Sequence, residues 1–338
     1  MLNRRMLVLA ASTALGAVLA LPAAAADFVA KIGHLESNLQ SRHVALEKVA
    51  AAVAERTDGA VEFQLFPQGQ LGQQREMTEG TQMGVMEATV APAAFLGGFN
   101  PVVSVMDIPF LIPADAEQAQ ALREGPFGQQ LCQSFDARGI TCLGLWPNGF
   151  KSLTSNKPIG SVADYAGQRF RVMDSKVLIE QFAAIGASAV VIDFSELYTA
   201  LQTGVVDGEE NPLDTMQRMK YNEVQKYLVV SDHGAMEDVI LFNTGWWESL
   251  PEEYQTIIVE EFTNAVPDLI AHKEQSVADA LAALTEAGMD VRELSDDERA
   301  EMAEKMAGPT REAYLALAGD EGRALLDTYE AEMAKLGN

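Results

Sequence analysis

A strand that carries a cation is the first feature of this sequence that could do chemistry. In residues 168–173, strand alternation sends Phe170 and Val172 to one face and Arg169 and Arg171 to the other. A guanidinium at the end of a strand, aimed into a cleft, could hold a carboxylate through two parallel hydrogen bonds. The alternative is a surface arginine paired with an acidic residue, and spacing alone does not separate the two.

A second cation and a carboxamide lie in two other segments. Lys151, within residues 146–154, falls where a first run of strands and helices gives way to a second. That is a natural place for a cation in a cleft, whereas a lone lysine is more often solvated. Asn211, in the turn-rich loop 205–212, could donate a hydrogen bond to a ligand oxygen, or it could cap a helix that begins near Pro212.

Motifs of known catalytic machinery are missing. The sequence has no G-x-S-x-G, no G-x-x-x-x-G-K-[ST], no G-x-G-x-x-G and no H-E-x-x-H. In so acidic a chain, the adjacent pairs at 209–210 and 252–253 are expected on a solvated face. Four histidines lack metal-ligand spacing and are expected to be structural or surface residues: His34, His43, His233 and His272. We expect no enzyme, no metal and no cofactor, and favour a binding protein that closes on a small solute.

Length, charge and composition narrow the class of protein. A chain of 338 residues is long enough for about two domains. Hydrophobic residues at 48% and charged residues at 22% argue against both wholesale disorder and a membrane-spanning bundle. The formal net charge of -25 argues against nucleic acid as a partner, because phosphate backbones are bound by cations.

The N-terminus is typical of a secretory signal peptide. Arg4 and Arg5 precede the apolar run 6–21, and small residues at 24–26 suit a signal peptidase. A membrane anchor is the alternative, but the run is shorter than the ~20 residues that a bilayer needs. We expect cleavage after Ala26 and export to the periplasm, by ordinary secretion rather than the twin-arginine route. The mature chain then has 338 - 26 = 312 residues and a charge of 22 - 49 = -27.

Export would place Cys132 and Cys142 in an oxidising compartment. Two thiols ten positions apart could form a disulfide there, or they could remain two buried cysteines, one on a helix over 127–138 and one on a strand over 140–146. Catalysis by either cysteine is not expected, because no histidine lies nearby in the sequence.

Strands alternating with helices must position these side chains. The pattern predicts an α/β fold with largely parallel sheet, in two lobes connected by crossing strands. Expected strands cover residues 28–35, 61–66, 87–91, 168–173 and 189–192, and expected helices cover residues 39–57, 73–83, 176–185 and 194–204.

Helix boundaries are predicted from capping signals. The helical pattern over residues 249–287 is unusually long, so this element could cross both lobes. Pro267 is expected to kink the helix or to divide it in two. Capping boxes are predicted at Asp193, Ser249 and Ser295. Two further helices are expected to finish the chain.

Six segments carry motifs that occur together, and in this order, in one known family: FPQGQLGQQREM (66–77), DIPFL (107–111), NGFKSLTSNKPI (148–159), GQRFRV (167–172), FSELYTALQTGVVDGEENP (194–212) and YNEVQKYL (221–228). Through them the chain resembles the extracytoplasmic substrate-binding proteins of TRAP transporters. The resemblance implies two α/β lobes, hinge strands and a long helix crossing both, closing over an organic anion.

The resemblance also implies roles for particular residues. The family's carboxylate-clamping arginine falls on Arg171, the asparagine of its DGQENP loop on Asn211, and the phenylalanine that lines its cleft on Phe194. Lys151 stands where the family has a second arginine. The lysine keeps the positive charge but cannot form the two parallel hydrogen bonds of a guanidinium. Arg42 takes about the place of a lysine in the C4-dicarboxylate branch and is a candidate ligand residue, although we expect it to be solvated.

Backbone amides around Pro92 complete the predicted site. The leading ligand is a C4-dicarboxylate such as succinate, fumarate or malate, because Arg171 and Lys151 could match two carboxylates. Alternatives are a sugar acid or a 2-oxo or hydroxy acid and, from other classes, an ABC-type receptor or a secreted enzyme.

The expected partners are the small and large subunits of a sodium-driven TRAP permease, and the receptor itself is expected to be a monomer. We expect one lobe to contain residues 27–148 plus about 237–276, and the other 149–236 plus about 277–338.

Overall fold

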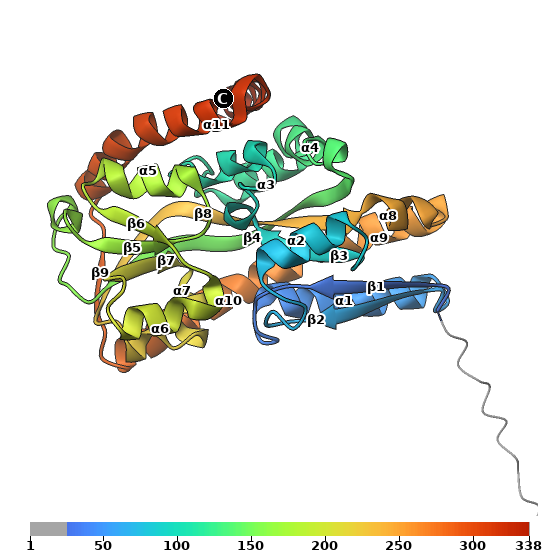
Figure 1. Cartoon of the computed structure of the whole chain (residues 1–338), viewed down its shortest axis with the longest axis horizontal. Coiled ribbons are helices and arrows are strands. Elements are labelled where there is room, and N and C mark those ends of the chain that lie inside the picture. The colour runs from blue at the N-terminus through green and yellow to red at the C-terminus, as the bar shows by residue number, and fades with distance from the viewer. Residues whose placement is uncertain (1–25, 338) are drawn as a thin grey trace, which may run out of the picture.

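A computed structural model describes residues 26–337, so the predicted signal peptide up to Ala25 lies outside the described part. Within it, nine strands form one mixed sheet (Figure 1). Their bounds are β1 (Phe28–Gly33), β2 (Val61–Phe66), β3 (Ala88–Pro92), β4 (Ile140–Ser155), β5 (Arg169–Val172), β6 (Ser188–Val191), β7 (Gly208–Asn211), β8 (Tyr227–Asn243) and β9 (Asp290–Glu293). The spatial order is β2-β1-β3-β8-β4-β7-β5-β6, with β9 pairing β8.

The two ends of this sheet are parallel and its centre is antiparallel. At one end β1 pairs β2 and β3 in parallel, and at the other β5 pairs β6 and β7 in parallel. In the centre, β8 runs antiparallel to both β3 and β4. The predicted α/β class and the two-lobed architecture are confirmed, while the lobe boundaries remain predictions.

Two long strands connect the ends. β4 has 16 residues and β8 has 17, and they pair along most of their length. The sequence predicted only the first part of β4, because Gly144, Pro147 and Gly149 suggest a turn. In the structure these residues lie at register shifts, where bulges absorb them and bend the strand without ending it.

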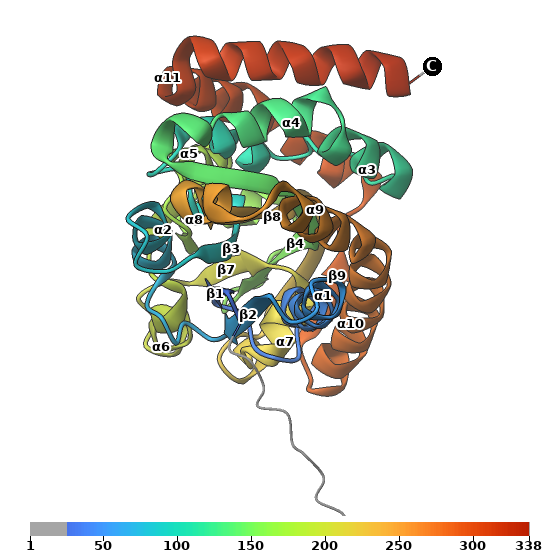
Figure 2. The same ribbon diagram turned by 90° about the vertical axis from the view of Figure 1, so that its right-hand side faces the viewer.

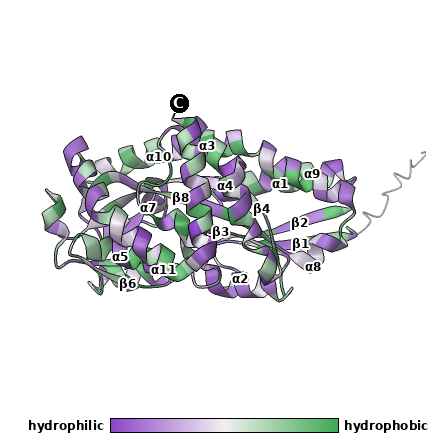
Figure 3. Cartoon of the chain, turned by 90° about the horizontal axis from the view of Figure 1, so that it is seen from above, coloured by the Kyte–Doolittle hydropathy of each residue, from purple (hydrophilic) through white to green (hydrophobic). Residues whose placement is uncertain are grey.

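Helices cover both faces of the sheet (Figure 2). One layer contains α3, α4, α5 and α11, and the other contains α1, α7, α9 and α10. Hydrophobic and hydrophilic residues both occur along these helices (Figure 3), as expected for helices with one buried face. Their bounds are α1 (Ser41–Arg56), α2 (Gln74–Gln82), α3 (Ala116–Glu124), α4 (Pro126–Gln133), α5 (Lys176–Ala184), α6 (Leu197–Gln202), α7 (Leu213–Arg218), α8 (Thr244–Ser249), α9 (Glu252–Asn264), α10 (Val266–Glu286) and α11 (Asp296–Leu336).

Short 3-10 turns complete the described chain. They are η1 (Ala93–Phe95), η2 (Pro101–Asp107), η3 (Asp136–Arg138), η4 (Val162–Tyr165), η5 (Phe194–Glu196) and η6 (Tyr221–Glu223). No helix within residues 26–337 is both long enough and apolar enough to cross a bilayer.

Pro267 divides the long C-terminal helical region. The structure has α9 and α10 with a break at Ala265, and Pro267 falls in the first turn of α10, where its missing N–H costs nothing. α10 contacts both α1 and α7, so it does cross from one end of the sheet to the other.

Only one of the three predicted capping boxes is confirmed. The side chain of Ser295 accepts from the Glu298 N–H, and the Glu298 side chain reaches back to Ser295. The predictions at Asp193 and Ser249 are wrong: Asp193 makes no side-chain cap, and Pro251 rather than Ser249 precedes α9. The two expected final helices are confirmed: the element labelled α11 consists of two helices that meet at a kink, where the backbone of Gly319 is not helical.

Cys132 on α4 and Cys142 on β4 form a disulfide. Its two sulfur atoms join the helical layer to one of the crossing strands, across ten positions of sequence. The structure therefore resolves the alternatives that the spacing left open.

Reducing this disulfide should lower the free energy of unfolding by about 2–3 kcal/mol, because the unfolded chain regains the freedom of the closed loop. Urea unfolding with and without a reductant measures the change. The double variant Cys132→Ser/Cys142→Ser is the control, since its midpoint should not respond to reductant. An unchanged wild-type midpoint would contradict the prediction.

Candidate functional site

Arg171 is a buried cation without an acidic partner. It lies on β5, an interior strand whose Phe170 stacks on Phe182 in the core. The whole residue is 0% exposed. Its Nε donates to the backbone oxygen of Ile192 at 2.8 Å, while Nη1 and Nη2 have no hydrogen-bond partner among residues 26–337. Burial lowers the pKa of Arg171, yet a guanidinium stays charged in proteins.

Two aromatic rings flank this guanidinium. Its central carbon is 5.8 Å from the ring centroid of Phe95 and 6.0 Å from that of Phe194. These distances fit cation-π contacts, which offset part of the cost of burying the charge. The rings come from different ends of the sheet, since Phe95 ends η1 after β3 and Phe194 begins η5 after β6.

Phe95 and Phe194 also border two cavities, both of which Leu35 lines as well. The outer cavity, of about 340 Å³, is further lined by residues on α2 and by Asp174, Ile192 and Asp193. The inner cavity is small, at about 20 Å³, and its remaining lining residues are Glu36, Arg42, Pro92, Asn211, Thr215 and Met236. Both cavities are therefore built from both ends of the sheet.

Asn211 ends β7 and points into the inner cavity region. It is 3% exposed, and its Nδ2 donates to Glu209 Oε2 at 2.5 Å. It does not cap α7, whose N-cap is Pro212, so that alternative is wrong.

The pair Glu209–Glu210 is not on a solvated face as expected, because both residues are 0% exposed. They occupy opposite faces of β7. Burial raises the pKa of Glu209 to about 7, against the hydrogen bonds that Asn211 and Thr154 donate and against nearby Arg171. A parallel strand register brings Arg171 and Glu209 together, although no hydrogen bond joins them.

Lys151 is buried and already neutralised. Its Nζ donates to Glu210 Oε1 at 2.8 Å, and Gln181 and His233 bind the other oxygen of Glu210. Burial alone would raise the pKa of Glu210, but Lys151 and His233 hold it well below its usual range. Gly234 makes room for the lysine, since a Cβ there would lie 2.9 Å from Lys151 Cε.

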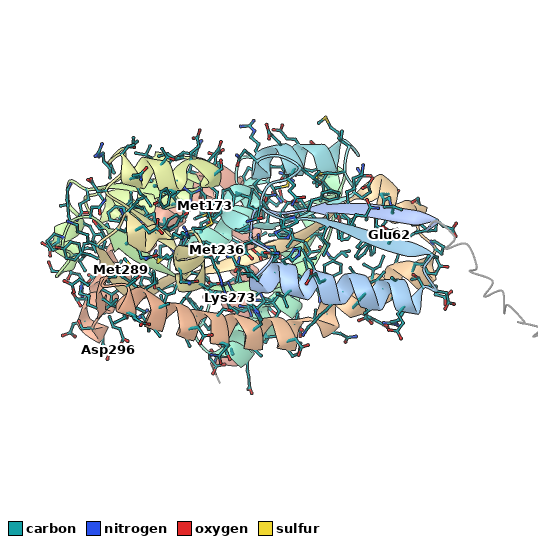
Figure 4. All side chains as sticks on the ribbon, turned by 90° about the horizontal axis from the view of Figure 1, so that it is seen from below. Glu62, Met173, Met236, Lys273, Met289 and Asp296 are labelled. Atoms are coloured by element: carbon teal, nitrogen blue, oxygen red, sulfur yellow. A yellow bond between two sulfur atoms is a disulfide. The ribbon has the colours of Figure 1, made fainter. Side chains whose placement is uncertain are left out.

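A small cavity adjoins Lys151. Pro92, Asp107, Met173 and Met236 are among its lining residues, and Figure 4 shows the two methionines close together in the middle of the molecule. Glu210 takes one of the three donors of the ammonium, so Lys151 can still donate towards this space.

Arg42 is not solvated, which corrects the expectation from the sequence. It is 2% exposed, and its Nε and Nη2 donate to the two carboxylate oxygens of Asp238 at 2.7 and 2.5 Å. Glu36 Oε1 lies 3.3 Å from Nη2. No short-range pattern could predict this, because Asp238 is 196 positions away in the sequence.

Pro92 ends β3 and lines both the inner cavity and the cavity beside Lys151. It pairs with Asp238 of β8, and Ala91 pairs with Val239. Proline has no N–H, so Pro92 forms part of the cavity wall but cannot donate a backbone hydrogen bond. The predicted role of backbone amides around it remains untested.

Hydrogen bonds close the cleft. Gln73 Nε2 donates to Ser195 Oγ at 2.7 Å, Gln40 Nε2 donates to Thr215 Oγ1 at 3.2 Å, and Ser175 Oγ donates to Asp107 at 2.6 Å. Each pair joins a residue before β4 to one after it, so the structure is a closed form.

A cavity of larger volume lies elsewhere. It measures about 420 Å³ and is lined by the disulfide, Trp146 and Phe262 among others. Its arginine, Arg123, is already paired with both oxygens of Glu237 at 2.8 Å. The charge needed to hold an anion is therefore at Arg171 and not there.

Several residues of the site carry no signal in the sequence. Phe95 is a single aromatic residue outside every motif that the sequence analysis singled out. Only the GEEN run around Glu209 could have drawn attention, and adjacent carboxylates do not by themselves indicate burial.

Comparison with known proteins gives a consistent result. Residues 32–316 match the family model described as bacterial extracellular solute-binding protein, family 7. The C4-dicarboxylate-binding periplasmic protein DctP of Rhodobacter capsulatus is 34% identical over 333 residues, covering 94% of this chain and 99% of DctP.

Solved structures are also similar. A TRAP periplasmic solute-binding protein from Desulfovibrio salexigens with bound orotic acid has 62% identity and a TM-score of 0.90, covering 91% of this chain and 99% of that one. The sugar acid binding protein DctPAm of Advenella mimigardefordensis, in complex with galactonate, has 30% identity and a TM-score of 0.84, with coverage of 91% and 99%.

Replacing the unpaired cation should stabilise the ligand-free protein. Arg171→Met keeps an apolar side chain of comparable length and removes a buried charge, so the free energy of unfolding should rise by about 1–4 kcal/mol. Urea unfolding of both proteins measures this. Arg169→Met is the matched control: Arg169 is exposed and pairs only weakly with Asp207, so the change should stay within about 1 kcal/mol. Destabilisation by Arg171→Met would show that the charge has a partner in the ligand-free protein.

Asp107 should make stability depend on pH. Burial raises its pKa from 3.8 to about 6 despite nearby Lys151 and the Ser175 hydrogen bond. The folded state therefore holds this proton more tightly, and the resulting stability is present below pH 4 and is lost as pH rises through 6. Relative to Asp107→Asn, the wild type should lose about 2 kcal/mol between pH 4 and pH 7. Urea unfolding at several pH values checks this, and parallel pH curves for the two proteins would contradict it.

Proposed function

The chain belongs to the bacterial extracellular solute-binding protein family 7, and on that premise we propose that its ligand is a flat organic acid with one carboxylate, orotate being the leading candidate. The protein is a solute receptor of the TRAP type, not an enzyme, and it works with a membrane permease. The ABC-type and enzyme alternatives are thereby set aside.

The unpaired guanidinium of Arg171 is the observation that carries the proposal. Both terminal nitrogens are free to donate in parallel to one carboxylate, the geometry for which a guanidinium is suited. A bound carboxylate would also neutralise a charge that is otherwise buried at considerable cost.

Charge balance favours one carboxylate over two. Of the arginines and lysines that the structure describes as buried, only Arg171 lacks an acidic partner; Arg42, Lys151 and Lys273 each have one. A second ligand carboxylate in the closed site would meet cations whose charge is already matched. Its desolvation would then be poorly compensated.

Ring stacking favours a flat ligand. Phe95 and Phe194 lie on either side of the cleft at similar distances from the Arg171 guanidinium. A planar ring whose carboxylate reaches Arg171 could pack against these two faces. The 62% identical relative has orotic acid bound, and orotate is a flat ring with a single carboxylate.

A C4-dicarboxylate is the second candidate. It is supported by the 34% identity to a C4-dicarboxylate-binding protein and by the remaining donors of Lys151. A sugar acid, as in the galactonate complex, would use the same donors through hydroxyl groups.

Delivery follows from the type of receptor. We propose export to the periplasm with cleavage after Ala26, opening and closing of the cleft around β4 and β8, and transfer of the ligand to a sodium-driven permease with small and large subunits. The predicted monomer belongs to this proposal as well.

A ligand screen tests the proposal. Melting of the purified protein should rise with orotate, because a ligand that binds only the folded state stabilises it by RT ln(1 + [L]/Kd). Calorimetry should then give a Kd for orotate at least about tenfold below that for succinate or galactonate, because the second carboxylate of succinate would be poorly compensated and galactonate has no flat ring to pack against Phe95 and Phe194. Arg171→Met is the control and should show no response to any of the three.

Two outcomes would contradict the proposal. Tighter binding of succinate or galactonate than of orotate would make the ligand class wrong. Orotate binding that survives Arg171→Met would make the carboxylate clamp wrong.

A further inference from the structure

Two buried carboxylates follow each other on β7 with opposite surroundings. Glu210 is bound by Lys151, Gln181 and His233 and is fully compensated. Glu209, on the other face, accepts hydrogen bonds only from neutral groups: Asn211 Nδ2 at 2.5 Å and Thr154 Oγ1 at 2.9 Å. The function proposed above leaves this second carboxylate without a role.

Glu209 decides which end of the Asn211 carboxamide faces the ligand. A carboxamide has a donor end and an acceptor end, whereas an ionised carboxylate only accepts. Glu209 therefore holds Nδ2, because the reverse orientation would bring two acceptor oxygens together. Oδ1 is left without a hydrogen bond from any residue in 26–337, and Asn211 lines the inner cavity.

The inner cavity and Arg171 share a wall. Phe194 lines the cavity beside Asn211, and its ring centroid is also 6.0 Å from the Arg171 guanidinium. An acid whose carboxylate is held by Arg171 therefore extends along Phe194 towards the Asn211 oxygen.

We propose that Glu209 is a positioning residue that presents the Asn211 carboxamide oxygen to the ligand and so selects organic acids with an N–H or O–H donor beyond their carboxylate. This rests on the proposed function, because Arg171 must hold the carboxylate. A ring N–H, as in orotate, pairs with the oxygen. A ligand group that only accepts, such as a second carboxylate, leaves both its own oxygen and Asn211 Oδ1 without a donor, which is costly in a closed site.

Matched ligand pairs test this in the wild type without any variant. Orotate is compared with pyrimidine-4-carboxylate, whose ring nitrogens only accept, and L-malate with succinate, which lacks the hydroxyl. Calorimetry at pH 8, where Glu209 is mostly ionised, should show about tenfold or more tighter binding of the donor-bearing member of each pair that binds.

Glu209→Gln should then remove most of the preference. The new carboxamide can donate to Asn211 Oδ1, so Asn211 can turn its Nδ2 to the ligand, and the ratio of the two Kd values should fall to about threefold or less. Glu253→Gln is the matched control: it makes the same chemical change on an exposed residue of α9 and should leave the ratio as in the wild type.

A double-mutant cycle separates positioning from a plain charge effect. In an Asn211→Ala background, Glu209→Gln should produce no further change in the ratio, because Glu209 acts through Asn211. A change of the same size in both backgrounds would overturn the proposal.

The wild-type comparison distinguishes failure of this inference from failure of the proposed function. Equal binding of both members of a pair would overturn the role of Glu209 while leaving the receptor function intact. Failure of all four acids to bind would overturn the proposed ligand class, and the selection by Glu209 with it.

Discussion

The buried, unpartnered guanidinium of Arg171 is the constraint on which the rest of the site depends. Removing such a charge from water costs several kcal/mol, and two ring faces and one backbone oxygen offset only part of that cost. A ligand carboxylate that met Nη1 and Nη2 would complete the pairing, which is why we propose this guanidinium as the clamp of the site.

Every other buried cation near the cleft is neutralised within the protein. Lys151 pairs with Glu210, and Arg42 pairs with Asp238. Among the buried lysines and arginines of residues 26–337, these pairs leave Arg171 as the one without a salt bridge, in a chain of net charge -25 and inside the cleft, where screening by salt is weak. An acidic exterior and a receptor for organic anions are therefore compatible.

The crossing strands β4 and β8 make the cleft possible. Lys151 lies on β4 and Asp238 on β8, so the charged pairs sit on the segments that join the two ends of the sheet. Bulges in β4 bend it at Pro147 to Phe150 and at Lys151 to Leu153, next to the lysine itself. Of the hydrogen bonds between the ends, the one from Gln73 to Ser195 is exposed and of a kind that opening could break at little cost, whereas those of Gln40 to Thr215 and of Ser175 to Asp107 are buried.

The class of the protein followed from local signals in the sequence. The ordered motifs predicted a two-lobed receptor and, by resemblance, made Arg171 the candidate carboxylate clamp, because such motifs need only neighbours along the chain. Most helix and strand positions followed for the same reason. The length of β4 did not, because its glycines and proline suggest a turn unless the pairing with β8 is known.

Which of the buried cations lack a salt bridge can be seen only in the folded protein. Arg42 meets Asp238 across 196 positions and Lys151 meets Glu210 across 59, and no local pattern encodes either pairing. The same holds for Glu209. Nothing in the sequence distinguishes it from the other acidic residues of the chain, and its burial results from pairing of β7 with β4 and β5. The charge balance in the cleft depends on groups that come from distant segments of the chain. It can therefore be seen only once folding has brought these groups together.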